Sequence, residues 1–152
     1  MIRSVLAVVA GVIVAVIVVA VVQVIGHAVY PPPPGIHHAD SEALKNIIAQ
    51  LPVGAIAFVL VGWGLGSLAG GLTAAAIAGR AQSAHALIVG CIQMAFGIHM
   101  LLMIPHPLWF VIASFAIVVP SAWLGARLAT LFWPSSPGGP QPYDMRRKNM
   151  AC

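Results

Sequence analysis

Long apolar runs alternate with short polar segments along this chain, and the runs predict its architecture. Four of them are long enough to cross a bilayer at about 1.5 Å of rise per helical residue; they cover residues 5–25, 53–78, 86–104 and 108–133. Pro52, Pro105 and Pro134 stand at the edges of these runs, where a residue with a fixed φ and no amide donor suits a helix boundary. The pattern predicts an all-α fold, a membrane-embedded bundle of four transmembrane helices over residues 1–133.

Two details of the runs change this picture locally. The first run is uncharged and exceeds the apolar core of about 7–15 residues in a signal peptide, so we expect a retained helix; cleavage near Gly26 is the alternative. Pro120 falls inside the fourth run, where it removes the amide that would bond the carbonyl of Ala116. We therefore expect a kink there, with a neighbouring helix or a hydroxyl compensating the freed carbonyl.

Composition and charge agree with a membrane protein and suggest its orientation. Hydrophobic residues make up 61% of the 152 and charged residues only 7%, against roughly 25% charged in a soluble domain. The net charge of +4 does not form a nucleic-acid footprint, because most basic residues flank or follow apolar runs. The positive-inside rule applied to Arg3, Arg80, Arg127 and residues 146–148 places both termini in the cytoplasm.

Two segments outside the runs have recognisable patterns. In the outer loop, residues 26–51, Asp40 can cap a helix over about 41–50. One face of that helix is apolar, which predicts an amphipathic helix on the outer membrane surface; its members are Leu44, Ile47, Ile48 and Leu51. The segment 134–152 is rich in Pro, Gly and Ser, and it predicts a disordered cytoplasmic tail.

Small residues recur every four positions on several of the predicted helices. The longest stripe lies in the second run, a shorter one in the first run includes Gly11, and Gly125 pairs with Ser121 in the fourth. In lipid, small residues let helix backbones approach closely. The stripe can pack the bundle internally or dock a partner subunit or a second copy; its central members are Gly62, Gly66, Gly70 and Ala74.

Histidines gather on the predicted outer side. His27 ends the first run, His99 lies about one turn inside the end of the third, and His106 follows in the next turn. Several imidazoles on one side of a membrane can ligate a metal, a haem or a chlorophyll-type pigment. These three residues are the candidate cofactor ligands, and interfacial anchoring and helix capping are the alternative roles.

Two resemblances bear on this choice. The segment Ala95-Phe-Gly-Ile-His99, followed by Trp109, resembles the Ala-xxx-His and downstream Trp of bacterial light-harvesting polypeptides, and the likeness implies His99 as a bacteriochlorophyll ligand. Three other segments resemble a family of small four-helix bacterial inner-membrane proteins, which implies a multi-pass protein of the bacterial inner membrane but no activity. They are Tyr30–Gly35, Gly62–Gly71 and Met103–Trp109.

The functional prediction rests mainly on what the apolar runs lack. No Asp, Glu, Lys or Arg lies at mid-depth in any run, whereas ion-coupled transporters usually need such a charge. Gln93 is the most polar residue there, and no nucleophile and base stand at a recognisable spacing. We predict a non-enzymatic accessory or scaffold subunit that contacts membrane lipids and other subunits or a second copy. A His-ligated cofactor and a small transporter or channel for a neutral or hydrophobic solute remain alternatives.

Overall fold

A computed structural model describes residues 2–31, 46, 50–79, 81–103 and 107–133. Within them it forms four α-helices, each long and apolar enough to cross a membrane: α1 (Ile2–Val29), α3 (Val53–Ala78), α4 (Gln82–Met103) and α5 (Leu108–Phe132). The predicted all-α fold with four candidate membrane spans is confirmed. The predicted tail over 134–152 and most of the predicted surface helix over 41–50 lie outside the described residues.

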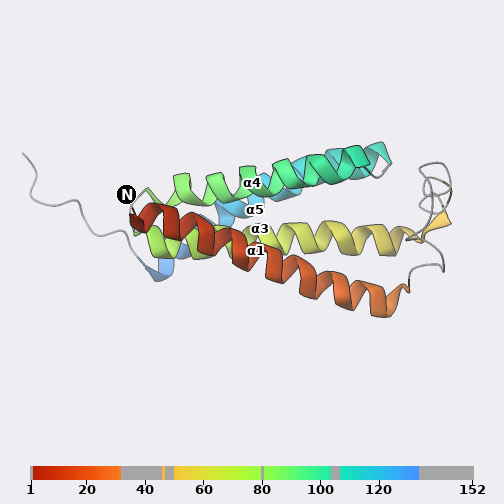
Figure 1. Ribbon diagram of the computed structural model, residues 1–152, viewed down its shortest axis with the longest axis horizontal. Helices are drawn as coiled ribbons and strands as arrows, with labels where there is room; N and C mark the ends of the chain where they lie inside the picture. Colours follow the sequence, from red (N-terminus) through yellow and green to blue (C-terminus); the bar gives the residue numbers. More distant parts are fainter. Residues whose placement is uncertain (1, 32–45, 47–49, 80, 104–106, 134–152) are drawn as a thin grey trace, which may run out of the picture.

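The four helices form a bundle around α3, which packs against α1, α4 and α5 (Figure 1). Successive helices run in opposite directions, so the start of α1 lies beside the end of α3. We call this side of the bundle the Arg3 end and the opposite side the Tyr30 end. α1 and α4 lie together near the Arg3 end and diverge toward the Tyr30 end (Figure 1). The wedge between them is the main irregularity of the bundle.

Two hydrogen bonds from side chains complete the Arg3 end. Arg3 Nε donates to the carbonyl of Ile77 at 2.7 Å, and Gln82 Nε2 donates to the carbonyl of Trp133 at 3.0 Å. Both acceptors belong to the carboxyl ends of helices, where the last carbonyls have no intrahelical partner. The positive charge of Arg3 also suits the negative end of the α3 dipole. Gly79 ends α3 in the left-handed conformation, with φ 69°, that favours glycine after a helix.

The helix bounds differ from the predicted ones in two ways. α1 ends at Val29 instead of residue 25, and two helices begin earlier than predicted, at or beside the residues that make these bonds. α1 begins at Ile2 instead of residue 5, and α4 begins at Gln82 instead of residue 86. Arg3 and Gln82 are polar, so apolar runs exclude them, yet each extends its helix by bonding a carbonyl far away in the sequence.

In the middle of the bundle, a hydrogen bond from a side-chain hydroxyl joins α3 to α5. α5 runs as a continuous helix through Pro120, and the buried Ser67 donates to the carbonyl of Val118 at 2.7 Å. The sequence predicted compensation at the carbonyl of Ala116. The observed hydroxyl bond instead joins α3 to α5 at Val118.

Ser67→Ala is therefore expected to lower the free energy of unfolding by about 1 kcal/mol, a typical value for an interhelical hydroxyl bond in a membrane. Thr73→Ala is the matched control, because Thr73 bonds the carbonyl of Ala69 in its own helix. The measurement is unfolding of the purified protein in mixed micelles with increasing SDS. Equal losses for the two variants would contradict an interhelical role for Ser67.

Candidate functional site

The predicted stripe on α3 faces α1 along its whole length. A Cβ atom at Gly70 would lie 2.6 Å from the carbonyl oxygen of Gly11, and one at Gly11 would lie 2.7 Å from the carbonyl oxygen of Gly70. At Gly66 a Cβ would lie 2.9 Å from the carbonyl oxygen of Ala15. Gly62 is less confined, because its nearest contacts are the Val22 side chain at 3.4 Å. The two backbones thus approach most closely around Gly11 and Gly70.

A second small-residue surface on α3 faces α5. A Cβ atom at Gly71 would lie 2.6 Å from the carbonyl oxygen of Ala122, and one at Gly125 would meet the carbonyl oxygen of Leu68 and lie 2.7 Å from the amide nitrogen of Leu72. The spacing of small residues predicted Gly125 as a packing position, whereas Gly71 had no predicted face. The spacing of seven between Gly64 and Gly71, which is two helical turns, was the available signal.

These contacts bear on the two interpretations of the stripe. Gly62, Gly66 and Gly70 all face α1, whose atoms would lie within 3.4 Å of a Cβ added at each of them, and Ala74 is fully buried. A partner could reach this stripe only if α1 left it. The surface available for another helix must therefore lie elsewhere on the bundle.

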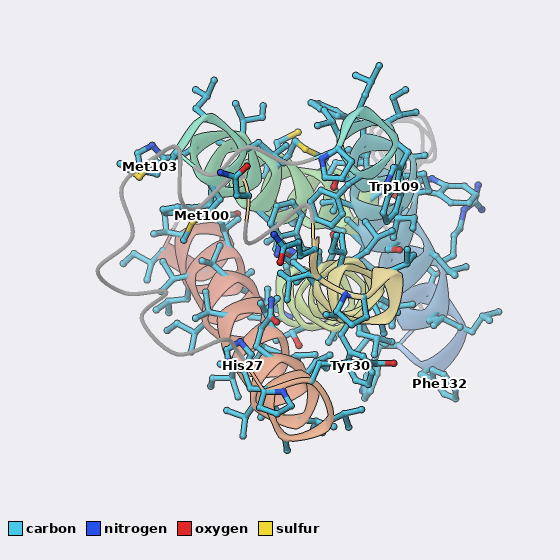
Figure 2. All side chains as sticks on the ribbon, turned by 90° about the vertical axis from the view of Figure 1, so that its right-hand side faces the viewer. His27, Tyr30, Met100, Met103, Trp109 and Phe132 are labelled. Carbon is cyan, nitrogen blue, oxygen red and sulfur yellow. The ribbon has the colours of Figure 1, made fainter. Side chains whose placement is uncertain are left out.

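The candidate histidine ligands are not brought together in the described residues. His27 and His99 are both exposed, near the Tyr30 ends of α1 and α4 respectively. Figure 2 shows His27 well apart from Met100, the residue that follows His99 in α4. His106 lies outside the described residues. Among the residues that were placed, no group of three or more His, Cys, Asp or Glu side chains could hold a metal ion.

One lipid-facing surface of α4 combines small residues with a polar one. Cys91, Ala95 and His99 are all exposed and follow one another at spacings of four. Residues four apart lie above one another on a helix, so the three form one continuous strip. We call this strip the α4 outer face. It is the small-residue surface of α4 that α1, α3 and α5 leave uncovered.

A pocket lies in the wedge where α1 and α4 diverge. Its volume is about 310 Å³, and the indole of Trp63 on α3 packs against Gly97 of α4 to form part of its floor, because a Cβ at Gly97 would lie 2.9 Å from that ring. The lining is apolar except at Gln93. The lining residues come from α1, α3 and α4: Val12, Ala15, Val16, Val19, Ala20, Trp63, Val89, Ile92, Gln93, Phe96, Gly97 and Met100.

Comparison with known proteins adds no relative to this description. No family model matches the chain, and neither a curated protein nor a solved structure is similar to it. The class of the protein therefore follows from its own architecture: four apolar helices of membrane-spanning length, compatible with a multi-pass integral membrane protein.

Proposed function

We propose that this protein is a non-catalytic accessory subunit of a larger assembly in the bacterial inner membrane, with both termini in the cytoplasm. The α4 outer face is the observation that carries the proposal. Small residues such as Cys91 and Ala95 allow another helix to approach the α4 backbone closely, which is the main source of packing between helices in lipid. A partner helix on this strip would cover a surface that the bundle itself leaves open.

His99 adds a polar reason for a partner at the same place. It lies four residues before the end of α4, about 6 Å along the helix axis, and its ring faces outward from the bundle. An ionisable side chain that faces lipid below the membrane surface is costly and usually acquires a partner. A hydroxyl or carbonyl on a docked helix would satisfy the imidazole. The proposed orientation is supported by Arg3 and Arg127, because both lie toward the Arg3 end of the bundle and basic residues favour the cytoplasmic side.

Crosslinking at Cys91 tests the proposal directly. The chain has two cysteines, so Cys152→Ser leaves Cys91 as the single thiol, on the α4 outer face. We expect a membrane-permeant reagent that carries a maleimide for Cys91 and a photoreactive diazirine, which inserts into any neighbouring polypeptide, to convert much of the protein in its native membrane into one adduct of defined mass. An adduct of twice the 15.8 kDa chain mass would identify a second copy, and any other mass would identify a different subunit.

The matched control moves the thiol to another lipid-facing position. Ile13 is 53% exposed on α1, so Ile13→Cys with Cys91→Ala and Cys152→Ser should give no defined adduct. Ala95→Leu, which adds bulk to the strip without touching α1, α3 or α5, should reduce the Cys91 adduct at least several-fold. The absence of any Cys91 adduct, with the protein isolated as a monomer, would refute the proposed subunit role.

A further inference from the structure

Gln93, one of the residues that line the pocket between α1 and α4, has an unpaired hydrogen-bond acceptor. Gln93 Nε2 donates to the carbonyl of Trp63 at 2.8 Å, which fixes the amide against α3. Gln93 Oε1 is buried and has no hydrogen-bond partner among the described residues. Gly66 lies beside this amide, where a Cβ would be at an ordinary contact distance of 3.6 Å from Nε2. The site thus has one anchored amide with its acceptor unused.

The depth of Gln93 determines what can satisfy this oxygen. Gln93 is at the middle of α4, a helix of 22 residues that is about 33 Å long at 1.5 Å per residue, close to the hydrocarbon thickness of a bilayer. Water is scarce at this depth, so a buried amide oxygen remains unpaired unless protein or ligand supplies a donor. Saturated or unsaturated acyl chains carry no donor. A phospholipid tail in the pocket would therefore leave the oxygen as it is.

The size and lining of the pocket limit the ligand further. A protein cavity of about 150 Å³ can hold a benzene molecule, and this pocket has about twice that volume, 310 Å³. That volume suits a molecule of about a dozen non-hydrogen atoms. Apolar side chains make up the lining apart from Gln93, so the ligand should be neutral and apolar over most of its surface.

The pocket also has an entrance from the lipid. Val16 on α1 is 60% exposed and Phe96 on α4 is 64% exposed, and both line the pocket. Met100, a flexible side chain that adapts to irregular shapes, lies on the same α4 rim. A lipophilic molecule dissolved in the bilayer can enter sideways between α1 and α4.

We propose that the α1/α4 pocket binds a neutral lipophilic molecule of about a dozen non-hydrogen atoms that carries one hydroxyl or N–H donor. Gln93 Oε1 is covered in the structure, so the neighbouring side chains shift when the donor bonds it. The apolar remainder fills the space between Val16, Phe96 and Trp63. This binding site goes beyond the proposed subunit role and does not rest on it, because the α4 outer face forms no part of the pocket lining.

A pair of isosteric probes separates the donor from the apolar contacts. 1-Naphthol and 1-methylnaphthalene have the same number of non-hydrogen atoms and differ by a hydroxyl in place of a methyl group. Affinities are obtained from the rise in the thermal unfolding midpoint of the full chain in detergent, since a ligand of the folded state stabilises it. We expect wild-type protein to bind 1-naphthol about five- to tenfold more tightly, the usual effect of one net hydrogen bond.

Two substitutions and one control assign that preference to the pocket. Gln93→Leu should retain binding of 1-methylnaphthalene and reduce the preference for 1-naphthol to about onefold. Ala20→Phe places a ring at the pocket lining away from Gln93 and should reduce binding of both probes at least tenfold. Ile13→Phe, on the exposed side of α1 and outside the lining, should leave both affinities unchanged.

Several results would overturn the proposal. Equal affinity of the wild-type protein for the two probes, or a naphthol preference that survives in Gln93→Leu, would show that the amide oxygen receives no ligand donor. Binding that persists in Ala20→Phe would place the probes elsewhere, and this result is decisive even if Gln93→Leu does not fold. Crosslinking of Val16→Cys, with Cys91 and Cys152 removed, to another polypeptide in native membranes would show that a protein helix occupies the pocket instead.

Discussion

Gly125→Ala is expected to lower the free energy of unfolding by about 3 kcal/mol, at the upper end of the usual cost of overpacking. The added methyl group would meet the backbone of α3 on two sides, at the carbonyl oxygen of Leu68 and the amide nitrogen of Leu72. Backbone atoms cannot move aside by changing a rotamer. The whole of α5 must therefore shift away from α3, and the Ser67 to Val118 hydrogen bond would lengthen with it.

SDS unfolding in mixed micelles measures this loss, and the adjacent Leu124→Ala serves as the control. Leu124 is 46% exposed, and truncating an exposed side chain removes little packing. We expect Leu124→Ala to change the unfolding free energy by less than about 0.5 kcal/mol. If Gly125→Ala were as stable as Leu124→Ala, the close contact between α3 and α5 described above would be wrong.

Gly70→Ala is expected to cost about 2 kcal/mol, because its methyl group would lie 2.6 Å from the carbonyl oxygen of Gly11 and 2.8 Å from the Cβ of Ala15. α1 would be displaced from α3 around the point where the two helices are nearest. The same substitution two turns away is the matched control. At Gly62 a methyl group would find the Val22 side chain at 3.4 Å, an ordinary contact.

Gly62→Ala should therefore be neutral, or slightly stabilising because alanine favours a helix more than glycine does. The same unfolding experiment compares the two variants. If all positions of the four-residue repeat were equivalent, Gly62→Ala and Gly70→Ala would lower the free energy of unfolding equally. The helix geometry instead predicts that the loss increases from Gly62 to Gly70. Equal losses would indicate that α1 follows α3 at constant distance, contrary to the contacts found here.

The gradient illustrates what periodicity could and could not predict. The spacing of four identified Gly62, Gly66 and Gly70 as one face of a helix, because residues four apart share a face regardless of what they contact. The distance of each glycine from its neighbour depends on how α1 crosses α3. That crossing is a property of two helices together and has no signature in the sequence of either one.

The pocket could not be predicted from the sequence either, because it also depends on how the helices cross one another. The polar character of Gln93 within an apolar run was plain, so the sequence analysis singled it out. Its bond to the Trp63 carbonyl depends on how α4 packs against α3. The lack of a partner for its other amide atom among the described residues depends on where the neighbouring helices lie. By contrast, the bounds predicted for 53–78 match those of α3, since Pro52 and Gly79 mark both ends in the local sequence.

The hydrogen bond from Arg3 to Ile77 also has a consequence for biosynthesis. Its acceptor is 74 residues later in the chain, so α1 leaves the ribosome and enters the bilayer long before this bond can form. Lipid can surround α1 at little cost before α3 enters the bilayer. The buried residues of α1 are Ala7, Gly11, Ala15 and Gly26, and none of them has a polar side chain that would be left unpaired. The last turn of α3 then completes the anchoring of the first turn of α1. Among the four described helices, α1 thus has the smallest buried share and depends least on the helices that follow it.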